Sequence, residues 1–307
     1  MIKRISVVAP AYNEEGIIGQ FVEKTIKTFK DNALEGEILI VNDCSTDNTK
    51  NILEDIAKRE PLLRIINNRK NLGLTGAAWT GFTNAKEEII VFLPSDMESD
   101  PEEDIPKLLV PINEGYDMAV GCRQGKKGNL IKYITSKGFN LLARIMFKVK
   151  AHDMGWIKAF KKEILDKVEL RSDWHRFFVI LATQEGYKVK EVKTRFYPRK
   201  TGKSKFGFFG FMRLPGGLLD MISIKFLTSF SKKPMFIFGS LGTLMISLGI
   251  IGGIYLSIIK IMAGHITERL PLLFLVILLI LSGIQLFATG FLAELLVSLR
   301  SSIERKK

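Results

Sequence analysis

Cysteine and histidine are scarce in this chain of 307 residues, which contains two cysteines and three histidines. Cys44 and Cys122 lie far apart and form no C-x-x-C pattern. The sequence therefore predicts neither a disulfide framework nor a zinc site, because both need closely spaced ligands. An amino-terminal secretion signal is also missing, since Met1 is followed by Lys-Arg and then by a short run, 5–9, that is too brief for an apolar h-region. We expect the amino-terminal part to stay in the cytosol.

Charge is nearly absent from two long segments near the carboxyl end, 234–259 and 271–293. Each exceeds the roughly 20 apolar residues that cross about 30 Å of hydrocarbon. We predict transmembrane helices at about 234–260 and 271–297, which form a hairpin within 234–299. Basic residues flank this hairpin on its outer ends: Lys225, Lys232, Lys233, Arg300, Arg305, Lys306 and Lys307. Because basic residues mark the cytoplasmic side, we expect a multi-pass membrane protein with its catalytic domain and both termini in the cytoplasm, ending in a basic tail, 300–307.

Smaller features of the carboxyl-terminal part leave alternatives open. Gly249 and Gly253 have a spacing that suits close helix packing, either as a seam or as a homo-oligomer contact, but it also occurs by chance. Glu294 is either a functional intramembrane charge or an interfacial carboxylate. The segment 206–233 mixes phenylalanine and leucine with basic residues, which is typical of helices lying at a membrane surface. An ordinary pair of core helices is its alternative.

Most of the net charge of +13 lies before residue 234. A basic domain attracts nucleic acid, an anionic membrane surface or phosphate-bearing substrates. Because the same chain carries two membrane-length runs, the membrane and phosphate interpretations are favoured. We expect no nucleic-acid partner.

The amino-terminal part alternates between strand and helix patterns. Short β-branched runs predict strands at 5–9, 37–41, 64–67 and 88–93, and helical spacing predicts helices at 14–32, 49–59 and 75–85. Alternation of this kind predicts an α/β fold with a mostly parallel sheet and covering helices. Ligands of such sheets bind beyond the carboxyl ends of the strands.

Polar residues gather at those predicted strand ends. They are Tyr12, Asn13, Glu14, Asp43, Ser45, Asp47, Asp96 and Glu98. Asn, Asp and Ser are also good turn formers, so Ser45 and Asp47 either contact a ligand or only hold a turn. Asp96 and Glu98 suit a hard divalent cation that carries a nucleotide diphosphate, with a solvated acidic loop as the alternative. Asp100, followed by Pro101 and Glu103, has the pattern of a helix cap and is assigned to capping.

The order of these motifs resembles family 2 glycosyltransferases of the GT-A (Rossmann-like) fold, and more narrowly the dolichol-phosphate mannose synthase and polyprenyl-phosphate glycosyltransferase group. The similar segments are VVAPAYNEE at 7–15, DCSTD at 43–47 and NLGL at 71–74. The resemblance spans most of 5–205 and implies a GT-A domain at 1–205. It also implies that a GDP- or UDP-linked sugar is bound by Pro10, Tyr12, Glu14, Asp43, Gly76 and Asp96.

The metal motif of this family, Asp-x-Asp-x-Gln, is altered in the chain. Residues 94–98 read Pro-Ser-Asp-Met-Glu, so a proline replaces the first aspartate and a glutamate replaces the glutamine. The resemblance implies Mg²⁺ or Mn²⁺ at Asp96 and Glu98, where the second negative charge offsets the one lost at Pro94.

The resemblance also extends to the acceptor side. It implies that an acceptor phosphate is bound by Arg123, Lys132, Ser136, Lys137, Arg199, Ser204 and Lys205. General attraction to an anionic membrane surface is the alternative for these basic segments. Asp153 is the nominated sugar-orienting or base-like carboxylate, and Asp96, Asp153 and Arg123 form the predicted catalytic set. Two further segments, at His152 and His175, resemble family segments that flank the sugar and the acceptor.

The function implied is inverting, metal-assisted transfer of a sugar from a nucleotide sugar to a polyisoprenyl phosphate, dolichyl or undecaprenyl, at the cytoplasmic membrane face. Two alternatives remain open at this point. A processive polysaccharide synthase of the same fold usually carries a Gln-x-x-Arg-Trp segment and more spans, and the chain shows neither. A catalytically weakened, membrane-tethered nucleotide-sugar binder is suggested by Pro94.

Overall fold

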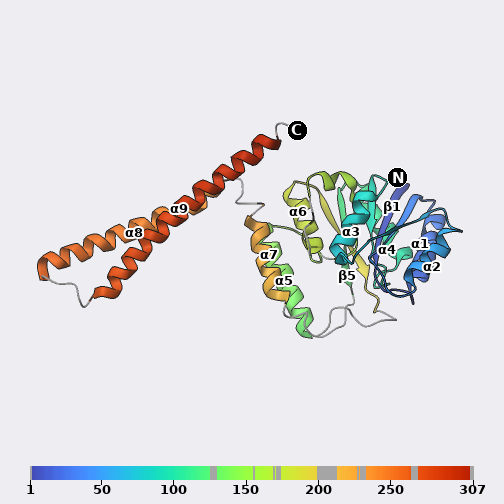
Figure 1. Ribbon diagram of the computed structural model, residues 1–307. Coiled ribbons are helices and arrows are strands. Elements are labelled where there is room, and N and C mark those ends of the chain that lie inside the picture. The colour runs from blue at the N-terminus through green and yellow to red at the C-terminus, as the bar shows by residue number, and fades with distance from the viewer. Residues whose placement is uncertain are drawn as a thin grey trace. The chain divides into compact units, whose positions relative to one another are not determined.

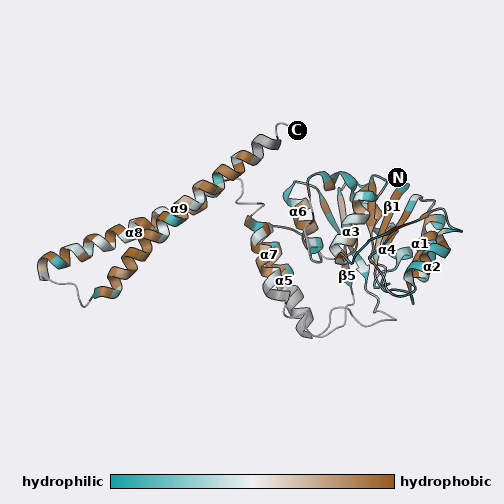
Figure 2. Ribbon diagram, in the orientation of Figure 1, coloured by the Kyte–Doolittle hydropathy of each residue, from teal (hydrophilic) through white to brown (hydrophobic). Residues whose placement is uncertain are grey.

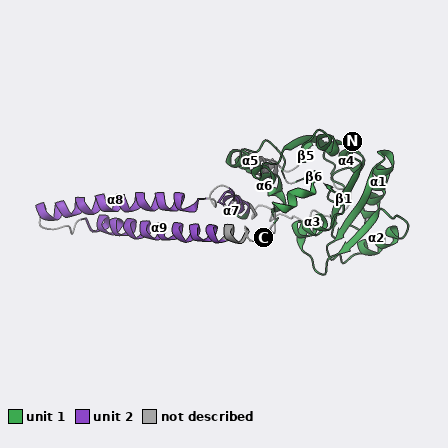
Figure 3. Ribbon diagram, turned by 90° about the horizontal axis from the view of Figure 1, so that it is seen from above, with its two compact units in different colours: residues 1–216 green, residues 217–307 purple. Residues whose placement is uncertain are grey.

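The computed structural model describes residues 2–124, 130–154, 156–168, 170, 174–198, 213–226, 228, 233–263 and 269–304, without the side chains of 130–137, 213–215, 263 and 300–304. The chain forms two compact units, 1–216 and 217–307 (Figure 3).

A mixed sheet of seven strands organises the described part of the first unit. In spatial order β3-β2-β1-β4-β6-β5-β7, its strands are parallel except β6, which runs antiparallel between β4 and β5. The bounds are β1 (Arg4–Ala11), β2 (Glu35–Asn42), β3 (Leu63–Asn67), β4 (Ile89–Phe92), β5 (Met118–Gln124), β6 (Lys158–Lys161) and β7 (Val189–Arg195). The four predicted strands are β1 to β4, and the mostly parallel sheet is confirmed.

Helices cover both faces of this sheet (Figure 1). They are α1 (Ile18–Asp31), α2 (Thr49–Ala57), α3 (Gly73–Asn84), α4 (Pro101–Asn113) and α6 (Phe178–Gln184). The first unit also contains α5 (Leu130–Phe147) and the short 3₁₀ helices η1 (Lys162–Asp166) and η2 (Trp174–Phe177). Side chains alternate along each strand, so Val7 packs with Phe21 of α1 and Ile105 of α4 in one core. Val8 points the other way, toward Gly81 of α3.

The first helix begins later than its pattern predicts. Helical spacing starts at Glu14, but α1 begins at Ile18, after a turn in which the Glu14 carbonyl accepts from the backbone N–H groups of Ile17 and Ile18. The N–H groups of Glu14 and Glu15 instead donate to Thr49 and Asp47. Tertiary hydrogen bonds therefore hold 12–15 as a loop at the end of β1.

An aromatic cluster fills the core on the α3 side of the sheet. Phe82 of α3 lies 5.5 Å from Phe92 of β4 and 5.0 Å from Phe160 of β6, between ring centroids. Phe160 in turn meets Phe178 of α6 edge-on at 4.9 Å. Such edge-to-face contacts add to the hydrophobic burial and tie α3 and α6 to the centre of the sheet.

The second unit contains α7 (Arg213–Lys225), α8 (Pro234–Ala263) and α9 (Leu270–Glu304). Within α8 and α9, Pro234–Met262 and Leu270–Leu299 are long and apolar enough to cross a membrane, with mean hydropathies of 2.0 and 2.6. Figure 2 shows the apolar character running along both helices. The structure thus contains the two long apolar helices that the sequence predicts.

Glycines bring α8 and α9 together. A Cβ atom at Gly283 would lie 2.6 Å from Ile246 and 2.7 Å from the Gly242 carbonyl oxygen, and one at Gly249 would lie 2.5 Å from Ile280. Gly249 therefore belongs to a packing seam inside the hairpin. Glu294 accepts a hydrogen bond from the Met235 N–H, 3.2 Å long, at the first turn of α8, which gives this carboxylate a structural role.

Candidate active site

The predicted site residues that the structure describes gather along one edge of the sheet. All six parallel strands end there, and the antiparallel β6 begins there, since Lys158 pairs with Phe92 on one side and with Val120 on the other. The loops after β1, β2 and β4, the end of β5 and the described residues just before β6 therefore meet at this carboxyl-terminal edge, where parallel α/β sheets bind ligands.

The loops after β1 and β2 are bound tightly to each other. Asn13, in the left-handed conformation with φ of 53°, donates its N–H to Ser45 Oγ at 3.0 Å. Its side-chain oxygen accepts from the Thr46 N–H at 2.8 Å. Asp47 accepts from the backbone N–H groups of Glu15 and Thr49. Ser45 and Asp47 thus hold the paired turns together, which is the structural one of their two interpretations.

The same hydrogen bonds set the charge of Asp47. Burial alone raises the pKa of this carboxyl, but the bonds from Thr49 and Glu15 outweigh it and bring the pKa below its ordinary value. Asp47 therefore carries a negative charge near neutral pH.

Asp43 lies at the end of β2 and is buried, with 3% exposure. Its Oδ1 atom accepts from Asn68 Nδ2 at 2.8 Å and from the Leu72 N–H at 2.9 Å. Asp43, which the sequence predicts to bind the nucleotide, therefore also fixes the residues just before α3. Gly76, in the first turn of α3, packs against Leu72, because a Cβ atom there would lie 2.6 Å from Leu72 Cβ.

The loop after β4 carries the predicted metal ligands. Ser95 is buried and donates to the Pro10 carbonyl at 2.8 Å, which joins this loop to the end of β1. Asp96 Oδ1 accepts from the Glu98 N–H at 3.2 Å across Met97, whose φ is 56°. The Glu98 carbonyl accepts from the Tyr197 N–H at 2.9 Å. A tight turn therefore places two carboxylates at the carboxyl-terminal edge.

Asp96 and Glu98 match a metal that brings most of its own ligands. Among the described residues, no group of three or more His, Cys, Asp or Glu side chains is arranged to hold a metal ion. Magnesium is commonly bound by one or two carboxylates together with substrate phosphates and water. Two carboxylates on a loop at the ligand-binding edge fit such a cation.

Asp100 caps α4, as the sequence predicts. Its Oδ1 atom accepts from the Glu102 N–H at 3.0 Å, and Pro101 occupies the first helical position. The reciprocal acceptor differs from the pattern: Asp104, one residue later than Glu103, accepts from the Asp100 N–H at 3.1 Å. Glu103 instead accepts from the Tyr197 hydroxyl at 2.6 Å. This contact joins Glu103 to a residue just after β7, so it depends on the tertiary structure.

Arg123 and Asp153 form a bidentate ion pair. Arg123 Nε lies 2.5 Å from Asp153 Oδ2, and Nη2 lies 2.9 Å from Oδ1. The guanidinium also lies over the Trp156 ring, 5.2 Å from its centroid. Both side chains are largely buried, so the pair is rigid and charge-assisted. Arg123, which the sequence predicts to bind phosphate, and Asp153, the predicted base-like carboxylate, therefore bind each other directly.

Other predicted acceptor residues fall where the structure gives no side chains. Lys132, Ser136 and Lys137 lie on α5 without described side chains, and Arg199, Ser204 and Lys205 lie outside the described residues. Farther along α5, Asn140 donates to the His152 carbonyl at 2.8 Å, and His152 contacts Glu191 through its N–H and its ring. The loop before β6 is thus tied to α5 and to β7.

Two polar groups lie on the α3 side of the sheet, of which Lys158 was not named from the sequence and His175 was named only as part of a family-like segment. Lys158, the first residue of β6, is buried with 2% exposure, and His175 Nδ1 lies 2.7 Å from Thr75 Oγ1. A signal for Lys158 was present, because strand alternation places it on the same face as Phe160, toward the core. Nothing local in the sequence pairs His175 with Thr75, which lies 100 residues earlier.

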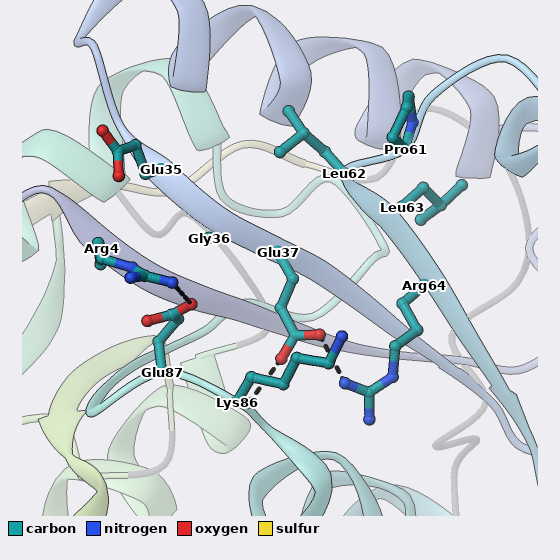
Figure 4. Close-up of a pocket in the computed structure, with 10 residues that line it drawn as sticks. All are labelled: Arg4, Glu35, Gly36, Glu37, Pro61, Leu62, Leu63, Arg64, Lys86 and Glu87. Atoms are coloured by element: carbon teal, nitrogen blue, oxygen red, sulfur yellow. Dashed lines mark hydrogen bonds and ion pairs between the residues drawn. The ribbon is translucent and has the colours of Figure 1, made fainter.

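A cavity of about 490 Å³ lies at the opposite, amino-terminal edge of the sheet (Figure 4). Arg4 binds Glu87 at 3.0 Å, and Arg64 binds Glu37 at 2.6 Å. Its lining is Arg4, Glu35, Gly36, Glu37, Pro61, Leu62, Leu63, Arg64, Lys86 and Glu87. None of the predicted site residues lines it. The acidic and basic side chains that line this cavity form ion pairs with one another, so we do not place the active site there.

Comparison with known proteins decides the family. The model of the family described as "Glycosyl transferase family 2" matches residues 6–169, which contain the loops after β1, β2, β4 and β5 and the loop before β6. The chain belongs to glycosyl transferase family 2. It is a glycosyltransferase by this membership, and the predicted family and enzyme class are confirmed.

Two curated relatives of this family 2 glycosyltransferase align with nearly its whole length. Dodecaprenyl-phosphate galacturonate synthase of Rhizobium johnstonii is 30% identical over 95% of the chain and 87% of the relative. Undecaprenyl-phosphate 4-deoxy-4-formamido-L-arabinose transferase of Proteus mirabilis is 29% identical over 95% of the chain and 88% of the relative. Both alignments are long enough to include the apolar helices as well as the sheet.

Solved structures confirm the GT-A-like fold. Glucosyl-3-phosphoglycerate synthase of Mycobacterium tuberculosis, in complex with phosphoglyceric acid, has a TM-score of 0.57 at 20% identity and covers 71% of this chain and 80% of its own. The same enzyme in complex with Mn²⁺, UDP-glucose and phosphoglyceric acid has a TM-score of 0.57 at 19% identity, covering 71% and 79%. At this level of identity the likeness concerns the fold.

Proposed function

We propose that this glycosyltransferase moves a sugar from a GDP- or UDP-linked donor to a polyisoprenyl phosphate at the cytoplasmic face of a membrane. The observation that carries the proposal is the joining, in one family 2 chain, of a carboxylate and arginine site with two helices long enough to cross a bilayer. The two relatives named above, which carry dodecaprenyl and undecaprenyl phosphate in their names, align with both parts.

Hydrogen bonds between neighbouring loops hold the donor side of the site in place. Pro10, Tyr12, Glu14, Asp43 and Gly76 would receive the nucleotide. The hydrogen bonds that join the loops after β1 and β2, and those from Asn68 and Leu72 to Asp43, organise this surface before a ligand arrives. A preorganised site loses less entropy on binding, which favours affinity for the nucleotide.

Asp96 and Glu98 would hold Mg²⁺ or Mn²⁺ through their carboxylates. Such a cation, when bound, supplies charge that stabilises a departing nucleotide diphosphate. The proline at position 94 adds no ligand, and Glu98 supplies the second carboxylate in its place. The chain's own contribution is to fix both carboxylates on one turn, which Ser95 joins to the end of β1.

The acceptor half would bind and orient the lipid phosphate. In the transfer, a phosphate oxygen bonds to the anomeric carbon while the bond from that carbon to the diphosphate oxygen breaks, and the configuration inverts. A phosphate ester is already an anion near pH 7, so no strong base is required. Arg123 is held by Asp153 and Trp156 in a form suited to phosphate, with Lys132, Ser136, Lys137, Arg199, Ser204 and Lys205 as further proposed ligands.

This division of labour assigns Asp153 an orienting role. Both of its oxygens accept hydrogen bonds from Arg123, so its charge is committed to the guanidinium. Cys122, next to Arg123, is not a nucleophile, because burial and Glu191 raise the pKa of its thiol to about 12. Positioning and charge neutralisation then account for the chemistry.

Transfer to lipid is the direct test. Membranes that contain the protein are incubated with labelled nucleotide sugars, Mn²⁺ and undecaprenyl phosphate, and label is counted in the organic extract. We expect extractable label with one nucleotide sugar, its loss in Asp96→Ala, and its retention in Asp55→Ala, where the aspartate is exposed and pairs with Lys58. Nucleotide-sugar binding without extractable label, under every sugar and metal tested, would favour a tethered binding protein.

A further inference from the structure

Lys158 is a buried lysine directly beneath the edge that carries the site. It begins β6 between Phe92 of β4 and Val120 of β5, so it lies in the centre of the sheet, beside the end of β4. Only 2% of the residue is exposed. Lysine is almost never fully buried unless its charge is paired, so this position requires an explanation.

The surroundings of the Lys158 ammonium are apolar on two sides. Nζ lies 5.4 Å from the Phe92 ring centroid and 5.8 Å from that of Phe178. Its hydrogen-bond acceptor is the His175 carbonyl oxygen, at 3.4 Å. Within the described parts of the chain no carboxylate forms an ion pair with Lys158, and the anion whose field reaches it is Asp153.

This arrangement costs stability. Moving a charge from water into a protein interior carries a penalty of several kcal/mol, which aromatic rings and one long hydrogen bond offset only in part. A methionine of similar length would fill the same space between Phe92 and Phe178 without that penalty. The presence of the ammonium is therefore better explained by what it positions than by what it stabilises.

The groups that Lys158 contacts lead to both halves of the site. The carbonyl it binds belongs to His175, whose ring bonds to the Thr75 hydroxyl at 2.7 Å in the first turn of α3. Gly76, the next residue, belongs to the proposed donor side. The field of Lys158 also acts on Asp153, the partner of Arg123 on the proposed acceptor side.

We infer that Lys158 is a positioning residue of the transfer reaction: its ammonium holds η2, and through His175 the first turn of α3, beside the proposed donor side of the site. The inference rests on the proposed function for its kinetic test and on the fold alone for its structural test. Lys158 itself touches no reacting atom in this role.

The charge of the Lys158 ammonium should be visible in the pH dependence of kcat/KM, on the alkaline side of the profile. Burial lowers the pKa of Lys158 to about 8, although Asp153 acts to raise it. Other ionisable groups on the elements beside it are His175 and Arg176 on η2 and Cys122 and Arg123 on β5, whereas β4, α3 and α6 contribute none. We expect kcat/KM of the wild type to fall as pH rises through about 8.

Lys158→Met and Lys158→Arg test the inference in full-length protein. In Lys158→Met we expect kcat/KM at pH 7 to fall by about 10- to 100-fold, as misplacement of a site commonly does, without an alkaline limb near pH 8. Its melting temperature should stay equal or rise, because a buried charge is gone. Lys158→Arg keeps the charge, and its alkaline limb should move to higher pH. Lys161→Met, on the same strand but paired with Asp117, is the matched control.

Amide hydrogen exchange supplies a readout that needs no activity. We expect peptides covering 73–80 and 174–178 to exchange faster in Lys158→Met than in the wild type or in Lys161→Met. The inference is overturned if Lys158→Met keeps wild-type kcat/KM, if its profile keeps the same alkaline limb, or if exchange in these peptides is unchanged. A wild type without transfer activity would refute the proposed function and leave the exchange test to decide this one.

Discussion

Both edges of the sheet carry charged side chains, but the partners of these side chains differ. At the amino-terminal edge, Arg4 pairs with Glu87 and Arg64 with Glu37 around a hollow, and the charges close on one another. At the carboxyl-terminal edge, Asp43 accepts hydrogen bonds from the Asn68 side-chain amide and the Leu72 N–H of the segment after β3, and Asp96 accepts one from the Glu98 N–H of its own loop. Amide donors leave a carboxylate its negative charge, whereas an arginine neutralises it. Asp43 and Asp96 therefore keep their negative charge for ligands, whereas Asp153 at the same edge is paired with Arg123 as the acids of the opposite edge are paired with their arginines.

The largest effect is expected at Asp96. Asp96→Asn keeps the shape of the loop but removes a proposed metal ligand, and we expect transfer to fall by about 1,000-fold, as loss of a key electrostatic group commonly does. The measurement is kcat/KM at saturating Mn²⁺. If Asp96→Asn kept kcat/KM within tenfold of the wild type, Asp96 would not be a metal ligand of the reaction, and the proposed difference between the two edges would be wrong.

Asp104 lies in the first turn of α4 at the same edge, and we expect it to affect the stability of the protein but not transfer. Burial raises the pKa of its carboxyl to about 7, and one of its oxygens, Oδ1, is buried without a described partner. Because the folded state holds this proton more tightly than the unfolded chain, stability falls as pH rises from about 4 to 7 and the full penalty applies above 7. We expect Asp104→Asn to raise the free energy of unfolding at pH 8 by about 3 kcal/mol.

The control for Asp104→Asn is the same measurement at pH 4. There the native carboxyl is already protonated, so the two proteins should unfold alike in detergent. An equal difference in stability at both pH values would show that the substitution acts through packing. Transfer activity should change little, because Asp104 faces the α4 cap.

Arg123 contrasts with an arginine of the opposite edge. Arg123→Lys loses the bidentate geometry toward Asp153, and we expect kcat/KM to fall by about 100-fold, a typical cost of misplacing a reacting group. Arg64→Lys, which alters the ion pair with Glu37, should leave kcat/KM unchanged. Equal losses in both variants would indicate a general effect on folding.

The hairpin extends the comparison to the second unit, where glycine packing replaces charge. Gly283→Ala places a methyl group 2.6 Å from Ile246 and 2.7 Å from a backbone oxygen, so we expect a loss of about 1 to 3 kcal/mol of stability. Gly253→Ala meets its neighbour Val276 at 3.7 Å, an ordinary contact, and should be tolerated. Thermal unfolding in detergent compares the two, and equal behaviour would contradict the seam.

The smallest effect is expected at the amino-terminal edge. Glu87→Gln removes the partner of Arg4, whose side chain is 68% exposed, and exposed ion pairs contribute about 0.2 to 1 kcal/mol. We expect a shift of that size in unfolding and none in transfer. A clear loss of activity in this variant would assign function to the hollow at this edge.

Prediction from sequence succeeded where the signal is local. Four strands, the covering helices between them, the two apolar helices and the cap at Asp100 follow from periodicity and from residue types at fixed spacing. The start of α1 was misplaced because Thr49 and Asp47 capture the N–H groups of Glu14 and Glu15. The later strands β5, β6 and β7 were not predicted, since β6 has only four residues and β5 and β7 carry weak alternation.

The sequence by itself determined the α/β class, the membrane-length helices and the carboxylates at strand ends, because each depends on neighbours along the chain. Only the tertiary structure decided that Arg123 binds Asp153, that Ser45 and Asp47 serve the turns, and that Lys158 lies in an aromatic core. The contacts of Ser45 and Asp47 arise because β1 and β2 lie side by side, and those of Arg123 and Lys158 arise because β6 inserts antiparallel between β4 and β5. Strand order is a long-range property that local periodicity does not encode.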